Sequence, residues 1–435
     1  MIARLVTARC LRTMSRATAP LSLVLVSLAL FLASPAVAQP PEGSGAAESK
    51  ATADIADRMI IPPPLEDLGR DYKIRLVYFV PSDCEVKENY RQKIEVLMRV
   101  VADIYRREMK SNGLNSRGLD FEFEEEGESD EQGKLKVFLV KGREPAVFYR
   151  GEPVDTRRMR NTQTQEIWEN TGFSRNRAVL VWTEVGSIAE ASPIPQHYSG
   201  FAYVSGDMLR DEITELTIEE QIENLLDTTP VQRGEGDKKQ PRNAEPQVAN
   251  GVLIHELGHI FGMLHDSANV NNVMYYGYHH LGRSFDSKTA ASRPVRFSPP
   301  HARMAAATRF LSEKFDAKDR EGPTIHEFSR LEPPKVGDET VRFKLKLSDN
   351  AGLSTLVCMQ RGGEWNDALV GDIDFKGEKE FEKTVTFTCP RPLGKSKPVM
   401  YWINVIDVNG NLSQQQIGWT QVLQEEESGE AEDGG

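Results

Sequence analysis

The 435-residue sequence predicts a mixed α+β domain followed by an all-β sandwich. Over residues 71–320, apolar residues at alternate positions, typical of strands, occur beside apolar residues at three- and four-residue spacings, typical of helices. Over residues 322–424 only the alternating pattern occurs, and turn signals interrupt it. Residues 39–70 are rich in Pro, Gly, Ala and Ser, which predicts a flexible leader. Residues 425–435 are acidic and predict a disordered tail.

The first 38 residues have the organisation of a secretory signal peptide. Residues 1–20 contain four arginines and no acidic residue, an apolar run follows over Leu21–Ala33, and Ala36–Ala38 forms a small-x-small cleavage site. The apolar run is shorter than the about 20 residues that a membrane-spanning helix needs, which argues against an uncleaved anchor. We therefore expect an exported protein, secreted or periplasmic, with no stable membrane anchor after signal cleavage.

Strand and helix patterns then follow in order along the first domain. Apolar residues alternate from Ile74 to Val80, which predicts a strand. From Tyr90 to Tyr105 they fall three and four residues apart, which predicts a long amphipathic helix ending near Asn112. The further elements expected are weak strands over 119–124 and 135–140, a buried strand over 178–182, a short strand over 200–204, a helix over 218–226, a structureless stretch over 228–247, a helix from 248, and a closing helix from Ser298 to about Phe315.

The second domain is predicted from about 100 residues of short strands. Apolar and charged residues alternate from Val341 to Leu347, apolar residues occupy every second position from Val399 to Val405, and turn signals follow both runs. This pattern is typical of an immunoglobulin-like β-sandwich. Such a module commonly serves as a spacer or a binding domain, and its fold does not identify a ligand.

Charge and cysteine content limit the possible partners. A net charge of −12 argues against a nucleic-acid-binding protein, because phosphate recognition needs clustered Lys and Arg. Cys84, Cys358 and Cys389 remain after the signal peptide. Cys358 and Cys389 lie in the same domain and could form a disulfide in an oxidising compartment, but the sequence alone leaves their pairing open.

The chemical signal of the chain is a stretch of twelve residues that begins at His255 and reads His-Glu-Leu-Gly-His-Ile-Phe-Gly-Met-Leu-His-Asp. On a helix, His255 and His259 share one face and can bind one metal ion. Gly262 permits a chain reversal, after which His265 can return as a third ligand. Glu256 lies beside the first ligand rather than on the metal. Three imidazoles leave a fourth zinc position open, which is typical of a catalytic site.

This stretch resembles the extended zinc signature of the metzincin clan of zinc endopeptidases. The clan also has a methionine turn beneath the metal, and Asn272–Tyr275 is similar to it, with Met274 in that position. The resemblance implies a metzincin-like domain, a mixed twisted sheet with a long helix and an active-site helix, over residues 71–320. It implies that His255, His259 and His265 bind Zn²⁺ and that Glu256 is the general base of peptide-bond hydrolysis.

The resemblance leaves the subfamily open. Asp266 after the third histidine is similar to adamalysin-type enzymes, and we expect it to hold local backbone or histidine geometry. Tyr276 is placed like the tyrosine of astacin-like enzymes, where it would donate a hydrogen bond to the transition state; a packed aromatic is the alternative. A matrixin-like turn would instead assign Tyr278 to the pocket wall. By similarity to the clan, the strand at the cleft edge, which could bind an extended peptide, contains Gly200, Phe201, Ala202 and Tyr203.

The sequence therefore predicts an exported zinc-dependent endopeptidase that acts on protein or peptide substrates. The alternative is a non-enzymatic exported binding or adhesion protein with a structural zinc site, and Glu256 argues against it because a structural site has no use for that carboxylate. Cys84 could occupy the fourth zinc position in a latent form, but a free cysteine is the simpler expectation. Calcium could bind at the turns containing Asp349 and Asp407, although turn formation explains both residues. We also expect residues 1–320 alone to retain activity.

Overall fold

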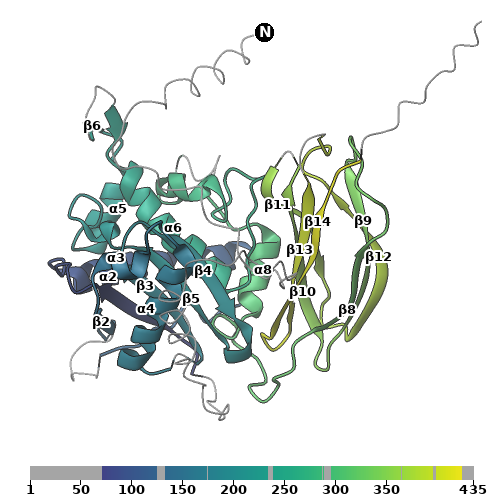
Figure 1. Cartoon of the computed structure of the whole chain (residues 1–435), viewed down its shortest axis with the longest axis horizontal. Helices are drawn as coiled ribbons and strands as arrows, with labels where there is room; N and C mark the ends of the chain where they lie inside the picture. Colours follow the sequence, from purple (N-terminus) through teal and green to yellow (C-terminus); the bar gives the residue numbers. More distant parts are fainter. Residues whose placement is uncertain are drawn as a thin grey trace, which may run out of the picture.

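The computed structural model describes residues 71–423, except 125–132, 174, 234–238, 287, 289–294, 364 and 395–397 (Figure 1). The expected signal peptide (1–38), leader (39–70) and acidic tail (425–435) lie outside the described residues. In the described part of the chain, no helix is long and apolar enough to cross a membrane. The expected mixed α+β architecture, with several sheets and an all-β antiparallel region, is confirmed.

A five-stranded sheet forms the centre of the N-terminal part. Its strand order is β2-β1-β3-β5-β4, in which the first four strands are parallel and β4 runs antiparallel to β5. The strands are β1 (Lys73–Val80), β2 (Val137–Lys141), β3 (Arg177–Thr183), β4 (Ala189–Ile194) and β5 (Ser199–Ser205).

Helices cover both faces of this sheet (Figure 1). Side chains of β1 alternate between the faces, so Leu76 and Tyr78 pack in one core while Val77 and Phe79 pack in the other. The first core includes α2 (Tyr90–Ser111) and α6 (Ala244–Ile260), and the second includes α3 (Ala146–Arg150) and α4 (Thr156–Thr171). The other elements before residue 320 are α5 (Ile218–Leu226), β6 (Pro230–Gln232), β7 (Lys239–Pro241), α8 (Pro299–Ala307) and the 3₁₀ helices η1 (Pro195–His197), η2 (Gly206–Leu209) and η3 (Tyr276–Ser284).

Three expected elements differ from the structure. Residues 119–124 form only isolated bridges, at Phe121 and Phe123, instead of a strand. The stretch over 228–247 contains the β6–β7 hairpin, and α6 begins at Ala244 because Pro246 fits the first turn of a helix. The closing helix ends at Ala307, since Thr308 already has extended backbone.

Two antiparallel sheets form the C-terminal part, with strand orders β11-β10-β13-β14 and β12-β9-β8. Their facing side chains make one core, which includes Phe343, Leu356 and Tyr401. Cys358 and Cys389 both lie in this core as free thiols. The strands are β8 (Thr324–Arg330), β9 (Thr340–Ser348), β10 (Leu353–Gly362), β11 (Trp365–Asp374), β12 (Glu380–Thr388), β13 (Val399–Asp407) and β14 (Leu412–Thr420).

The outer face of the four-stranded sheet packs against the N-terminal part, beside α8 (Figure 1). Val357 and Met359 of β10 share a buried cluster with Met304 of α8 and with Leu264, which lies just before the third histidine. Arg309, only 1% exposed, follows α8 and donates from Nε to the carbonyl oxygen of Asn409 over 2.8 Å. The two parts of the chain therefore share a buried interface next to the histidine motif.

Candidate metal centre

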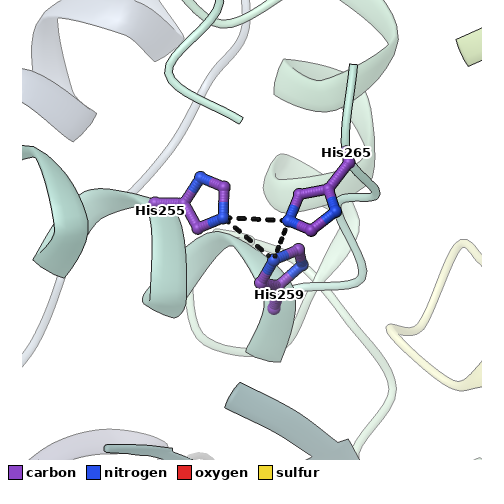
Figure 2. A group of neighbouring side chains, drawn as sticks. All are labelled: His255, His259 and His265. Atoms are coloured by element: carbon purple, nitrogen blue, oxygen red, sulfur yellow. Dashed lines mark hydrogen bonds between the residues drawn. The ribbon is translucent and has the colours of Figure 1, made fainter. Parts of the chain in front are cut away.

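Figure 2 shows that His255, His259 and His265 point their rings at one another. Their Nε2 atoms are 3.1 to 3.2 Å apart in all three pairs. His255 and His259 are one turn apart on α6, as the four-residue spacing predicts. After α6 the chain reverses at Gly262, whose φ of +83° favours glycine, and brings His265 to the other two.

The hydrogen bonds at the far side of each ring determine where its proton lies. Nδ1 of His255 donates to the carbonyl oxygen of Val273 over 2.9 Å, and Nδ1 of His259 donates to that of Met263 over 2.9 Å. Nδ1 of His265 donates to Oδ2 of Asp367 over 3.1 Å. Since the proton is on Nδ1 in each ring, three Nε2 lone pairs face one point.

The three lone pairs fit a cation. Burial, with a smaller contribution from the neighbouring His265, lowers the pKa of His255 to about 3, and burial also holds the pKa of His259 well below its usual range. Three neutral rings whose acceptor nitrogens face one another repel, and a cation between them would remove this repulsion. Zn–N distances of 2.0 to 2.1 Å in a tetrahedron correspond to nitrogens about 3.3 Å apart, close to the separation found here.

Met274 packs against α6 at Gly258, the residue before His259. It is fully buried, and a Cβ at Gly258 of α6 would lie 2.6 Å from its Sδ. Only glycine at 258 therefore lets this turn of α6 approach the methionine so closely. The backbone N–H of Met274 donates to Oδ1 of Asn272 over 2.9 Å, which holds the turn.

Glu256 is a buried carboxylate with an unsatisfied oxygen. Its side chain is 4% exposed, and Oε2 has no hydrogen-bond partner among the described residues. Burial, with a smaller contribution from the charge of Glu190 on β4, raises the pKa of Glu256 well above its usual range. A buried carboxylate oxygen without a partner is costly and marks a position where a proton or a ligand is expected.

The carboxylate of Asp266 accepts hydrogen bonds from neighbouring backbone N–H groups and from a side-chain amide. Its Oδ2 accepts from Nδ2 of Asn272 over 3.0 Å, and its carboxylate also accepts from the backbone N–H groups of Ala268 and Leu369. Burial raises the pKa of Asp266. Of the two roles expected for this residue, the local-backbone role is the one that its contacts fit.

Asp367 of β11 is a site residue that the sequence did not reveal. It accepts from His265, as described above, and its two carboxylate oxygens accept from Nε and Nη2 of Arg361 over 2.6 and 2.9 Å. Although burial alone raises the pKa of Asp367, the hydrogen bonds from His265 and Arg361 hold it below its usual range. Its carbonyl oxygen also accepts from the N–H of Ser267 over 2.9 Å. The C-terminal part thus orients the third histidine and its loop.

We expect Asp367→Asn to weaken zinc binding by about 10- to 100-fold, because a neutral amide holds the His265 ring less strongly than a carboxylate. Asn is suitable because it tolerates the positive φ of 37° at this position. The measurement is competition for zinc with a chromophoric chelator. Asp374→Asn, an exposed position at the end of the same strand, is the matched control. Equal zinc affinity of the two variants would contradict the orienting role.

The aromatic residue beside the histidines is Tyr278, not Tyr276. Tyr278 is buried, its ring centroid lies 5.6 Å from that of His255 in an edge-on arrangement, and burial and the charge of Glu256 raise its pKa. Tyr276 is 49% exposed and stacks on His279 with centroids 4.4 Å apart. In this structure Tyr276 therefore lies at the surface against His279, and its hydrogen bond to the transition state stays a prediction.

The expectation that residues 200–203 form the edge strand is wrong. Gly200, Phe201, Ala202 and Tyr203 belong to β5, which pairs with β3 on one side and with β4 on the other. The edge strand is β4, which contains Pro193, a residue compatible with an edge because it cannot donate to a neighbouring strand. A Cβ at Gly200 would lie 2.7 Å from Cγ2 of Ile260, so glycine here lets β5 pack closely on the end of α6.

Cys84 has partners away from the histidines. Its Sγ lies 3.7 Å from Oδ1 of Asp83 and 3.7 Å from the carbonyl oxygen of Glu184, and it is a free thiol. Burial and the adjacent Asp83 raise its pKa, which disfavours a metal-binding thiolate. These contacts agree with a free cysteine and give no support to a zinc-blocking one.

His301 of α8 supports the methionine turn from below. It is fully buried, and its Nδ1 lies 3.2 Å from Nδ2 of Asn272, which donates to it. Burial lowers the pKa of His301 to about 3. The folded protein therefore resists protonation of this ring, whereas the unfolded chain takes up the proton below about pH 6.5.

We expect this difference to destabilise the fold as the pH falls from about 6.5 toward 3, by about 1.4 kcal/mol per pH unit for His301 alone. A His301→Gln variant lacks the titrating ring. The unfolding free energy of the wild type, minus that of the variant, should therefore decrease by this slope in urea titrations of the metal-free proteins. A difference that is the same at pH 7 and pH 5 would contradict a buried neutral His301.

Comparison with known proteins identifies a similar fold. No protein-family model and no curated protein matches the sequence. The structure is similar to that of OgpA from Akkermansia muciniphila. Catalytically inactive OgpA in complex with an O-glycopeptide (glycodrosocin) substrate has 13% identity and a TM-score of 0.51, and the match covers 80% of this chain and 92% of that chain. Wild-type OgpA has 12% identity, a TM-score of 0.51 and the same coverage. At this identity the similarity shows a shared fold.

Proposed function

We propose that this chain is an exported zinc-dependent endopeptidase of the metzincin type. The observation that carries the proposal is the convergence of three Nε2 acceptors, from His255, His259 and His265, next to the unsatisfied buried oxygen of Glu256. A structural zinc site in a binding protein would need a fourth protein ligand, and the group of possible metal ligands here contains only the three histidines in the described part of the chain.

Bound between the three histidines, zinc would act as a Lewis acid toward a peptide carbonyl and would make water more acidic. Glu256 takes a proton from the attacking water at Oε2 and passes it to the nitrogen of the leaving amine. Burial raises the pKa of Glu256, so its carboxylate is a stronger base than an exposed one. Tyr278 shields the same space from solvent through its packing on His255.

The edge strand β4 is the proposed binding surface for an extended substrate. It is the outermost strand of the sheet, and Glu190 on it is close enough to Glu256 to raise its pKa. An extended peptide could pair with the free edge of β4 and pass the catalytic carboxylate. Glu190 itself is held by an ion pair with Arg160, in which Nε and Oε2 are 2.9 Å apart.

The shared fold with OgpA makes O-glycopeptides the first substrates to test. The inactive OgpA holds an O-glycopeptide substrate, so a panel should pair each O-glycosylated peptide with the same peptide without the sugar. Cleavage of the glycosylated member alone would assign an O-glycopeptidase. Cleavage of both would assign a general endopeptidase.

The experiment that tests the proposal is a digest of this panel by the purified protein, analysed by mass spectrometry. We expect cleavage with zinc, loss of cleavage with 1,10-phenanthroline, and recovery when zinc is restored. Metal analysis of the same samples should give one zinc per chain. One bound zinc without cleavage of any peptide or protein in the panel would favour a structural zinc site in a binding protein.

A further inference from the structure

A second group of possible metal ligands lies at the junction of the two parts of the chain. Carboxylate oxygens of Asp319, Asp349 and Asp407 lie within 4.8 Å of one another. The three residues come from different segments: Asp319 precedes β8, Asp349 follows β9, and Asp407 ends β13. Their convergence is a tertiary arrangement, so the formation of any single turn does not explain it.

Asp349 contributes an unsatisfied oxygen to this group. The residue is 8% exposed, and its Oδ1 accepts from the backbone N–H groups of Ala351 and Gly352 over 2.9 and 2.7 Å. Oδ2 is buried and has no hydrogen-bond partner among the described residues. Turn formation therefore accounts for one oxygen of Asp349 and leaves the other without a function, although burying it is costly.

The charges of the group are only partly balanced by the buried guanidinium of Arg309. Although burial raises the pKa of Asp319, hydrogen bonds from Asn350 and Asn409, with a smaller contribution from the charge of Arg309, hold it below its usual range. The guanidinium of Arg309 donates to the carbonyl oxygens of Asn409 and Asp319 and to Oδ1 of Asn411, and these are all neutral groups. Burial, together with the charges of Asp349 and Asp319, raises the pKa of Asp407 to about 7. The three carboxylates thus repel one another in the absence of a bound cation.

We propose that Asp319, Asp349 and Asp407 bind one calcium ion. Calcium takes six to eight oxygen ligands at variable geometry, which suits carboxylates from three separate segments. Magnesium is less suited, because it requires near-ideal octahedral geometry and loses its water reluctantly. Asp319 is only half-buried, so water can reach the ion and complete its coordination.

Calcium at this position would join the two parts of the chain. Asp316, which lies just before Asp319, donates from its backbone N–H to Oδ1 of Asn409, and Nδ2 of Asn409 donates to Oδ2 of Asp319. The ion would therefore fix the segment that leaves the N-terminal part against the turn between β13 and β14. This inference is independent of the proposed zinc site and of peptide cleavage.

The test uses the zinc-loaded full-length protein in calcium-free buffer, titrated with CaCl₂ by isothermal titration calorimetry. We expect one site with a dissociation constant of about 10⁻⁴ to 10⁻³ M, as in extracellular calcium modules. A melting curve with calcium at about ten times that constant should rise by about 3 °C or more. No heat and no change in melting temperature up to about 10 mM calcium would overturn the proposal.

Three variants test whether calcium binds at this group rather than responding to the net charge of the protein. Asp319→Asn changes the half-buried ligand, which the fold tolerates best, and should lower calcium affinity at least about tenfold. Asp349→Asn should do the same and, as a neutral side chain, should not destabilise the calcium-free protein. Glu339→Gln, exposed at the opposite end of β9, is the matched control and should bind calcium like the wild type.

Equal calcium affinity in Asp319→Asn and Glu339→Gln would overturn the assignment to this group, and an equal response to MgCl₂ would overturn the assignment to calcium. Zinc content, measured in every sample, should stay at one per chain. Failure of the calcium proposal is therefore distinguishable from failure of the zinc proposal.

Discussion

Replacement of Glu256 by Gln is expected to leave zinc bound and to lower kcat by about 10²- to 10⁴-fold. Gln has nearly the same shape as Glu but cannot take a proton from water, so the attacking group is no longer generated in place. The three histidines keep their own hydrogen bonds to Val273, Met263 and Asp367 and do not depend on this side chain. The measurement is the steady-state rate on the best substrate of the panel, with zinc content determined on the same sample.

The melting temperature of Glu256→Gln shows whether a loss of activity comes from unfolding. Because burial raises the pKa of Glu256 above 4.5, its charged form destabilises the metal-free protein at neutral pH, and Gln removes that cost. The metal-free variant should therefore melt at the same or a higher temperature than the wild type at pH 7. Glu223→Gln, an exposed position on α5, is the matched control for activity. A variant that keeps zinc and full activity would remove Glu256 from the mechanism.

A chain that ends at residue 320 is expected to lose both zinc binding and activity. This reverses the expectation from the sequence that residues 1–320 suffice. Truncation removes the partners of Leu264 and Met304, and each newly exposed apolar side chain costs about 1.5–3 kcal/mol. It also removes two of the acceptors of Arg309, the carbonyl oxygen of Asn409 and Oδ1 of Asn411, at about 0.5–1.5 kcal/mol each. These costs are large beside a total stability of about 5–15 kcal/mol.

The truncation also removes two hydrogen bonds that hold the loop from Gly262 to His265. Nδ2 of Asn404 on β13 donates to the carbonyl oxygen of Gly262 over 2.8 Å, and Asp367 holds His265. A chain that ends at residue 424 keeps both contacts and is the matched control, with full zinc content and activity expected. Metal analysis, peptide cleavage and near-ultraviolet circular dichroism of both chains form the measurement. A folded chain of 320 residues with one zinc and normal activity would show that zinc binding and activity do not need the C-terminal part.

Local spacing was sufficient to predict α2 and the grouping of three histidines. The three- and four-residue spacing from Tyr90 to Tyr105 continues along a helix that ends at Ser111, and its apolar face is buried against the sheet. His255 and His259 are brought together by one helical turn, and Gly262 has the positive φ that the chain reversal needs. Each of these features depends on residues within about one or two turns of each other, which periodicity describes well.

Features that depend on tertiary register could not be predicted in this way. Asp367 is 102 residues from His265, and no spacing rule connects them. The sequence of β4 has no clear strand pattern, because Ile194 is its only large aliphatic residue, whereas β5 contains an apolar run. Tyr276 and Tyr278 follow Met274 by two and four residues, and only the path of η3 decides which of them packs on His255.

The contacts of Asp367 and Asn404 with the loop that carries His265 have a consequence for biosynthesis. Asp367 and Asn404 are synthesised more than 100 residues after the first two histidines, so a nascent chain carries His255 and His259 long before the groups that hold the third ligand exist. A partly made polypeptide would therefore hold metal weakly, and hydrolytic competence would arise only when translation and folding of the last strands are nearly complete. Under the proposed function, this order delays peptide hydrolysis until the chain is nearly complete.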